Sequence, residues 1–216
     1  FSETFSHYLM EVCSGGGSTQ PDSDVEAEHV IFVVNGSISL DIDNKQIPLT
    51  SGGYAFIPAG KKWSLHNTDS KKAVFHWIRK RYQPVDGIEH PDILITSDSE
   101  VTAEPMPGTD GVWATSRFVD PNDMRHDMLV NIVTFQPGGV IPFAETHVME
   151  HGLYVLEGKG VYYLNGDWKE VEAGDYMWLR AFCPQACYAA GSTPFRYLLY
   201  KDVNRHMKLT QSGIRA

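Results

Sequence analysis

Residues 139–158 read GVIPFAETHVMEHGLYVLEG, and residues 17–36 read GSTQPDSDVEAEHVIFVVNG. Both stretches begin and end with glycine, carry a histidine at the same position, and then continue into a run of apolar and β-branched residues. They are offset by 122 residues. Self-similarity at a fixed offset is typical of a duplicated structural unit, so the chain is predicted to contain two copies of one domain.

The same offset aligns turn and strand residues well beyond these stretches, from residue 12 to about residue 80 without a gap. Gly52 aligns with Gly174, for example, and the strand aromatics align as well. The segment that follows the first copy is rich in Pro, Asp and Ser, which is typical of a connector. We therefore predict one domain over residues 1–85, a connector over 86–105, and a second domain over 106–216.

Both copies consist of short runs rich in Val, Ile, Leu, Phe and Tyr, separated by Gly, Pro, Asn and Asp, whereas patterns with a helical period are scarce. Such runs predict short β-strands, and many of them at even spacing indicate a sandwich or a barrel-like double sheet. The predicted strands are His29–Val34, Ser37–Ile42, Tyr54–Ile57, Ala73–Arg79, Leu129–Phe135, Leu153–Leu156, Val161–Leu164, Tyr176–Leu179 and Phe195–Tyr200.

The composition excludes several classes of protein. Among the 216 residues, 18 Lys and Arg stand against 27 Asp and Glu, and the net charge of −9 disfavours binding to nucleic acid or to an acidic membrane surface. No run of apolar residues is long enough to span a bilayer. Three cysteines do not make a disulfide framework, and the chain shows no signal peptide, so we expect a cytoplasmic protein. We also expect a leading segment before Phe1.

Four side chains of the second copy form a candidate metal site. Glu145 and His147 are two residues apart, so on a strand they point to the same face, and His151 can return beside them after a short turn. Gln185 can reach the same point from a later strand. A buried carboxylate beside two imidazoles is costly unless it is paired or bound to a metal, so these residues predict a divalent metal site.

The glycine-framed stretches around this set resemble the two cupin motifs, Gly-x5-His-x-His-x3,4-Glu-x6-Gly and Gly-x5-Pro-x-Gly-x2-His-x3-Asn. Glu145 stands in place of the first His, His151 in place of the Glu, and Gln185 in place of the last His. This resemblance implies an all-β tandem of double-stranded β-helices, or jelly rolls, known as a bicupin. The first copy keeps Gly52-x5-Pro58-x-Gly60 but not the ligands, and we expect it to be metal-free; its four positions are Ser23, Val25, His29 and Trp63.

The ligand set is narrower than that of cupins in general. The segments 145–152, ETHVMEHG, and 197–205, YLLYKDVNR, closely resemble the bicupin (S)-ureidoglycine aminohydrolases, once called glyoxylate-induced proteins. The resemblance implies hydrolysis of (S)-2-ureidoglycine to (S)-ureidoglycolate and ammonia, a step of allantoin and purine catabolism. It also implies one Mn²⁺ per chain in the second domain, and carboxylate, amide and imidazole ligands suit Mn²⁺ better than Cu²⁺.

The resemblance also assigns roles to individual residues. It implies metal binding by Glu145, His147, His151 and Gln185, substrate binding by Glu145, Gln185, Tyr197, Lys201 and Tyr162, and catalysis by Lys201 and Glu145. On a strand, Tyr197 and Lys201 share a face, so a lysine there could pair with a substrate carboxylate or act as the acid that protonates departing ammonia.

Other functions stay open at this point. Glu145, His147 and His151 could instead hold Fe²⁺ in an oxygenase, or the metal in another enzyme acting on small acids, although Gln185 fills a position that such oxygenases leave open. A ligand-binding cupin without enzymatic activity and a purely structural protein are further alternatives. Apart from a small-molecule substrate, we expect the partners to be other copies of the chain in a homo-oligomer, because sheet edges favour association.

Overall fold

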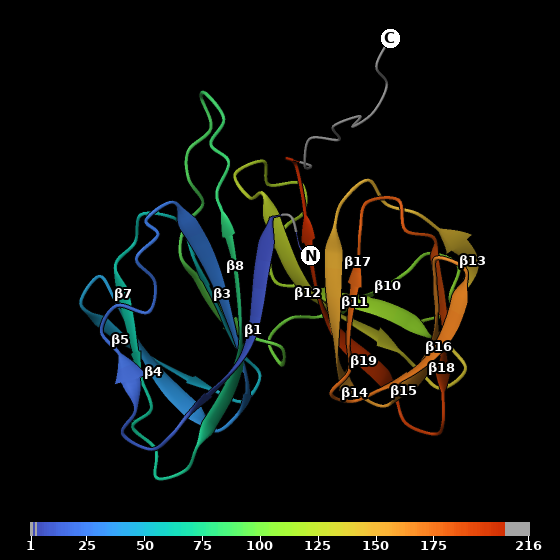
Figure 1. Cartoon of the computed structure of the whole chain (residues 1–216), viewed down its shortest axis with the longest axis horizontal. Helices are drawn as coiled ribbons and strands as arrows, with labels where there is room; N and C mark the ends of the chain where they lie inside the picture. The colour runs from blue at the N-terminus through green and yellow to red at the C-terminus, as the bar shows by residue number, and fades with distance from the viewer. Residues whose placement is uncertain (1, 3, 206–216) are drawn as a thin grey trace.

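The computed structural model describes residue 2 and residues 4–205, and over these residues its regular structure is entirely β. Two barrel-like double sheets lie side by side, one formed by each repeat (Figure 1). The prediction of an all-β tandem of double sheets is therefore confirmed. None of the described residues forms a helix that is long and apolar enough to cross a membrane.

The first barrel contains the strands of the first repeat. They are β1 (Phe5–Val12), β2 (Gly17–Ser18), β3 (Ala27–Asn35), β4 (Ser37–Ile42), β5 (Lys45–Thr50), β6 (Gly53–Ile57), β7 (Trp63–His66), β8 (Ala73–Arg81) and β9 (Leu94–Ser97). One sheet has the order β1-β8-β3-β6-β9 and the other the order β2-β7-β4-β5.

Among the described residues, the second barrel repeats this arrangement with two additional strands at one edge of the larger sheet and no counterpart of β9 at the other. Its strands are β10 (Ala103–Pro105), β11 (Trp113–Arg117), β12 (Met128–Phe135), β13 (Val140–Glu145), β14 (His151–Glu157), β15 (Lys159–Leu164), β16 (Asp167–Glu172), β17 (Tyr176–Leu179), β18 (Gln185–Ala190) and β19 (Phe195–Asp202). The order β10-β11-β12-β19-β14-β17 forms one sheet, and β13-β18-β15-β16 forms the other.

Each strand predicted from the sequence is present, most of them longer by one or two residues at an end. The duplication is also visible in the turns, because the β4–β5 and β15–β16 hairpins have the same form. Asp43 and Asn44 have positive φ angles of 53° and 62°, and their counterparts Asn165 and Gly166 have 49° and 110°. Positive φ at both central residues is the requirement of a two-residue hairpin turn whose twist matches that of the strands, which favours Asn, Asp and Gly there.

The predicted connector is not without structure. Within residues 86–105, β9 pairs with β6 of the first barrel, and β10 pairs with β11 of the second. The segment therefore extends one sheet of each barrel. The domain boundaries at 85 and 106 stay a prediction, and residues 1, 3 and 206–216 of the predicted domains lie outside the described part of the chain.

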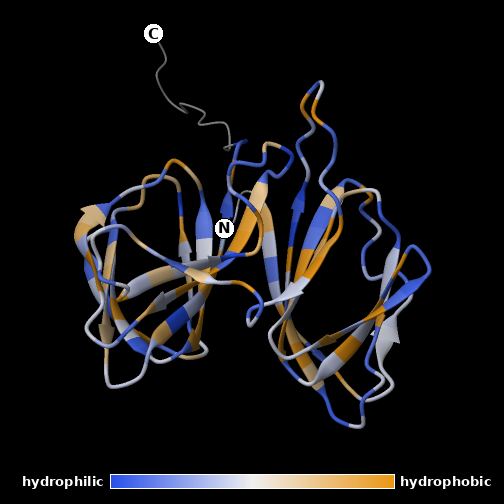
Figure 2. Cartoon of the chain, turned by 180° about the vertical axis from the view of Figure 1, so that it is seen from behind, coloured by the Kyte–Doolittle hydropathy of each residue, from blue (hydrophilic) through white to orange (hydrophobic). Residues whose placement is uncertain are grey.

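Each barrel has its own apolar core, and a third core lies between the barrels. Along β8 and β19, alternate residues face opposite sides of the sheet. Phe75 and Tyr197 thus face their own barrel, whereas Ile78 and Leu198 face the other one. Figure 2 shows apolar residues on the strands of both barrels and between them. This interface core consists of Phe5, Val30, Phe32, Tyr54, Phe56, Ile78, Phe118, Met128, Val130, Ile132, Leu198 and Tyr200.

Charged side chains are buried at the same interface. Lys80 is 2% exposed, and its Nζ donates to the main-chain oxygen of Asp127 at 2.9 Å. Asp202 and Glu28 are also fully buried there. Burial raises the pKa of the Glu28 carboxyl well above its usual value, and the neighbouring Asp127 charge raises it further. The two barrels are thus held together by an apolar core and by a buried ionic group.

Candidate metal-binding active site

The four predicted ligands come from three strands and one loop of the second barrel. Glu145 is the last residue of β13, His151 is the first of β14, and Gln185 is the first of β18. The prediction that Glu145 and His147 share a strand is wrong, because β13 ends at Glu145 and His147 lies in the following loop. Glu145 and Gln185 are nevertheless direct cross-strand partners beyond an irregularity in the β13–β18 pairing.

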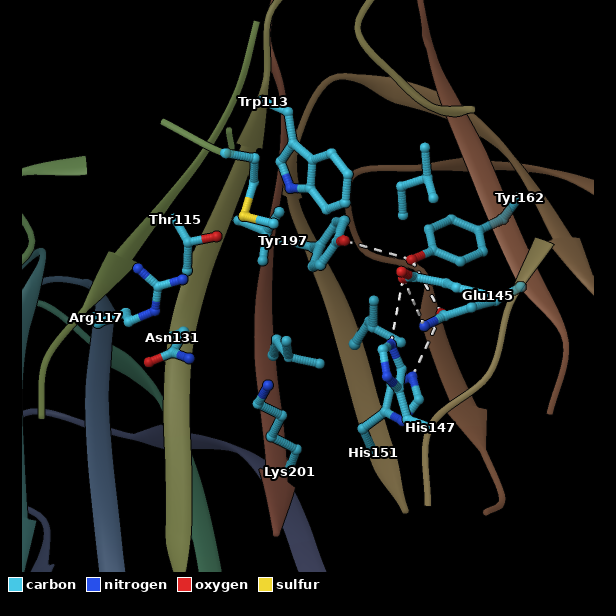
Figure 3. Close-up of a pocket in the computed structure, with 16 residues that line it drawn as sticks. Trp113, Thr115, Arg117, Asn131, Glu145, His147, His151, Tyr162, Tyr197 and Lys201 are labelled. Atoms are coloured by element: carbon cyan, nitrogen blue, oxygen red, sulfur yellow. Dashed lines mark hydrogen bonds and ion pairs between the residues drawn. The ribbon is translucent and has the colours of Figure 1, made fainter. Parts of the chain in front are cut away.

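Glu145, His147 and His151 lie together inside the barrel (Figure 3), and Gln185 contacts Glu145 and His151. Glu145 Oε1 lies 3.2 Å from His147 Nε2 and accepts a hydrogen bond from Gln185 Nε2 at 3.3 Å. His151 Nε2 lies 3.3 Å from Gln185 Oε1. Among the described residues, no three His, Cys, Asp or Glu side chains form a metal-holding group by themselves. The Gln185 amide is therefore the group that connects His151 with the Glu145–His147 pair.

The donor atoms of this set fit a divalent metal. A carboxylate, an amide oxygen and two imidazoles are the harder nitrogen and oxygen ligands of divalent ions such as Mn²⁺. Burial lowers the pKa of His151, which favours the neutral imidazole that a metal ligand must present. The side chain of His147 is 36% exposed and that of Glu145 is 20% exposed, so the set is open to the pocket on this side.

The residues predicted to contact substrate line the same pocket. Tyr162 Oη lies 3.3 Å from Tyr197 Oη and donates to Gln185 Oε1 at 3.4 Å. Burial raises the pKa of both phenols well above the usual value, so they stay protonated. Lys201 is the cross-strand partner of His151, and burial lowers the pKa of its ammonium, with a further lowering from nearby Arg117.

The structure thus brings every predicted site residue to one cavity of about 170 Å³. This is below the range of about 300 Å³ and more that accommodates drug-sized ligands, so the cavity suits a small substrate. Glu145 is the sole carboxylate among the described residues that line it. The individual roles of these residues stay predictions.

Sequence reasoning missed the opposite wall of the cavity. Trp113, Thr115 and Arg117 extend from β11, and Asn131 extends from β12 (Figure 3). The run 113–117, WATSR, was not predicted as a strand because it is short and only partly apolar. One signal was present: Asn131 interrupts an otherwise apolar run at a position that shares a face with Val133 and Phe135.

The equivalent pocket of the first barrel holds different chemistry. His29 takes the place of His151, but its Nδ1 accepts a hydrogen bond from Trp77 Nε1 at 3.3 Å, and burial lowers its pKa to about 4. Arg79 takes the place of Lys201 and reaches Asp22, with 2.6 Å between Nε and Oδ2. The His29 imidazole thus lies beside the Arg79–Asp22 ion pair. That the first domain binds no metal stays a prediction.

Comparison with known proteins agrees with this architecture. A family model described as the cupin domain matches residues 8–79 and 131–200, which is one match in each barrel. A solved structure of a glyoxylate-induced protein from Pseudomonas aeruginosa superposes with a TM-score of 0.92 at 60% sequence identity, covering 98% of this chain and 78% of that chain.

Two curated relatives point in the same direction. The (S)-ureidoglycine aminohydrolase of Escherichia coli K12 is 32% identical over 207 residues, which are 95% of this chain and 78% of the relative. A rice protein named a probable (S)-ureidoglycine aminohydrolase is 36% identical over 202 residues, which are 93% of this chain. The chain spans 63% of the rice protein, which is less than two thirds of its length.

Proposed function

This chain belongs to the (S)-ureidoglycine aminohydrolase family of cupin proteins, and we propose that it hydrolyses (S)-2-ureidoglycine to (S)-ureidoglycolate and ammonia. The proposal includes one Mn²⁺ per chain, held by Glu145, His147, His151 and Gln185. One observation carries it: the four-ligand set and Lys201 line one small cavity, in which Lys201 lies next to His151 across two paired strands.

The metal would supply Lewis acidity and a fixed point for orienting the substrate. Side chains of the protein would carry out the proton transfers. The Lys201 ammonium lies where it can donate a proton to the amine that departs as ammonia, and its lowered pKa makes it a better acid. Glu145, the carboxylate of the cavity, would accept the proton that water loses as the new C–O bond forms. The proton gained by Glu145 balances the proton lost by Lys201.

The two tyrosines would position the substrate. Their hydroxyls are 3.3 Å apart in a fully buried part of the cavity, and both keep their protons because of their raised pKa values. Each can therefore donate a hydrogen bond to a substrate oxygen without gaining charge. Both tyrosines are buried, which strengthens the polar contacts made there.

We place this reaction in allantoin and purine catabolism in the cytoplasm, carried out by a homo-oligomer. An exposed aromatic patch on the outer sheet of the second barrel supports self-association. Trp168 is 55% exposed and Tyr188 is 43% exposed, and their ring centroids lie 5.9 Å apart. Neighbouring exposed aromatic residues of this kind are typical of protein interfaces.

The test is an assay of the purified, Mn²⁺-loaded protein on freshly generated (S)-ureidoglycine. We expect one ammonia per substrate and ureidoglycolate of the (S) configuration alone. Oxygen consumption and metal analysis in the same samples distinguish the alternative of an Fe²⁺-dependent oxygenase, in which Gln185 would have no ligand role. Ammonia release no faster than the spontaneous rate would contradict the proposed function.

A further inference from the structure

The cavity has two walls of different chemistry. The metal-ligand set and Tyr162 lie on one side, and Arg117 and Asn131 lie on the opposite side, on neighbouring strands (Figure 3). Arg117 and Asn131 are direct cross-strand partners in the β11–β12 pairing. Nothing in the proposed reaction so far uses this second wall, although it places an amide and a guanidinium side by side.

Asn131 is the unusual residue of this wall. It is 3% exposed, lies in the middle of β12, and its Oδ1 is buried without a hydrogen-bond partner among the described residues. A buried acceptor without a partner lowers stability, and an apolar residue such as its strand neighbours would avoid this loss. The Asn131 amide therefore lowers the stability of the fold, and it does so at a position that lines the cavity.

Trp113 and Arg117 add donors to the same wall. Within the described part of the chain, the Trp113 Nε1–H is likewise buried without a hydrogen-bond partner. Arg117 binds Glu104 through Nη1, and its guanidinium has further N–H groups beyond this contact. The wall thus offers one vacant acceptor, on Asn131, and several donors around it.

This pattern matches a urea group. A ureido group presents N–H donors beside a carbonyl acceptor, and an asparagine amide presents the reverse pattern in one plane. The other end of ureidoglycine, with its carboxylate and amine, would face Lys201 and the metal ligands in the proposed function. The ureido end would then extend toward β11 and β12.

We propose that Asn131 determines the specificity of this pocket for a terminal ureido group: its Oδ1 accepts a hydrogen bond from the ureido NH₂, and the Arg117 guanidinium donates to the ureido oxygen. The inference rests on the proposed function, because it assigns the part of the substrate that the reaction leaves unchanged. A site that must pair a buried polar group rejects ligands that lack the complementary group.

The test compares two stable ligands of the Mn²⁺-loaded full chain by isothermal titration calorimetry. Hydantoate carries the terminal –CO–NH₂ of a ureido acid, and N-acetylglycine replaces that NH₂ by a methyl group. We expect the wild type to bind hydantoate at least about tenfold more tightly, because only hydantoate satisfies Asn131 Oδ1. Equal affinities in the wild type would overturn the proposal.

Variants at one position isolate the acceptor. Asn131→Leu removes it and is expected to abolish the preference, whereas Asn131→Asp retains an acceptor oxygen in the same shape and is expected to keep it. Asn131→Ala replaces the leucine variant if thermal unfolding shows that leucine disrupts β12. Asn122→Ala, at an exposed turn, is the control and should match the wild type. A preference that survives both Asn131→Leu and Asn131→Ala would overturn the assignment.

The outcomes separate this inference from the proposed function. Ammonia release from ureidoglycine without a preference for hydantoate would leave the function intact and reject the role of Asn131. A preference for hydantoate without ammonia release would support the ureido site and reject the proposed reaction.

Discussion

Lys80 Nζ lies 2.6 Å from Asp202 Oδ1 in the buried interface between the barrels, and these two residues occupy the same position in the two repeats, 122 residues apart. The same offset separates Gln83 from Arg205, whose Nε donates to the Gln83 carbonyl at 3.1 Å. Contacts between equivalent positions are those that lie on a two-fold axis. The barrels therefore meet about a local two-fold axis that passes beside the Lys80–Asp202 pair.

Breaking this pair is expected to destabilise the fold strongly. Lys80→Met leaves Asp202 and Asp127 buried without their cation, and removing one partner of a buried ion pair costs about 3–5 kcal/mol. Chemical denaturation measures the loss of unfolding free energy. Lys61→Met is the control: Lys61 pairs with Asp43 at the surface, with 40% and 52% exposed side chains, and should change stability by less than about 1 kcal/mol. Equal losses of unfolding free energy in Lys80→Met and Lys61→Met would show that the buried pair stabilises the fold no more than the surface pair does.

Acid is expected to weaken the protein through two neighbouring histidines, of which His76 is buried and His7 is partly buried. His7 Nε2 lies 2.9 Å from His76 Nδ1, and burial lowers the pKa of His7 to about 4 and of His76 to about 3. In the unfolded chain both titrate near about 6.5, so below that pH the unfolded state binds more protons than the folded state. Stability is fully present above this pH and is lost as the pH falls toward 4 and below.

The decline should reach about 1.4 kcal/mol per pH unit for each imidazole. His76→Gln removes one titrating group, so its unfolding free energy should fall less steeply than that of the wild type between these pH values. Denaturation series at several pH values measure both slopes, and contributions from other groups, such as Glu28, are common to the two proteins. Parallel curves would show that His76 does not remain neutral in the fold.

Gln185 is expected to contribute an oxygen ligand to the metal. Gln185→Leu should lower Mn²⁺ affinity more than about tenfold and abolish ammonia release, whereas Gln185→Glu keeps an oxygen and should retain the ion. Titration followed by electron paramagnetic resonance measures the free Mn²⁺. Gln46→Leu, the same substitution at an exposed position of β5, is the matched control. Unchanged Mn²⁺ affinity in Gln185→Leu would remove Gln185 from the ligand set.

Lys201 is expected to affect catalysis without affecting metal binding. Lys201→Met keeps the length of the side chain but removes the proton donor, so kcat should fall by about 10²–10⁴-fold while Mn²⁺ affinity stays unchanged. Lys169→Met, an exposed lysine of β16, should leave both quantities as they are. A variant with wild-type kcat would exclude Lys201 as the acid.

The strands could be predicted because their apolar runs are short and bounded by turn residues, and the duplication could be predicted because the turn glycines recur. The candidate ligand positions came from their spacing and from the resemblance to the cupin motifs, and their proximity in one cavity agrees with both. Asn131 and Arg117 could not be assigned in this way, because their proximity arises from the β11–β12 register and not from the spacing of any motif. His147 was placed on a strand because a two-residue spacing carries no sign of where a strand ends.

The interface was less predictable still. Alternation along β8 and β19 shows that two faces are apolar, but not that each barrel covers the other. Lys80 stands in the sequence KRY at residues 80–82, which predicts an exposed lysine. The fold instead buries its side chain against Asp202. A charge partner 122 residues away leaves no local pattern.

The opposite charges of Lys80 and Asp202 also govern which barrels can pair. If two first barrels from different chains met about the same axis, two Lys80 ammonium groups would face each other, and two second barrels would bring two Asp202 carboxylates together. Both homotypic arrangements bury like charges, whereas the pairing of a first with a second barrel neutralises them. The Lys80–Asp202 pair thus favours the pairing of a first with a second barrel over either homotypic pairing.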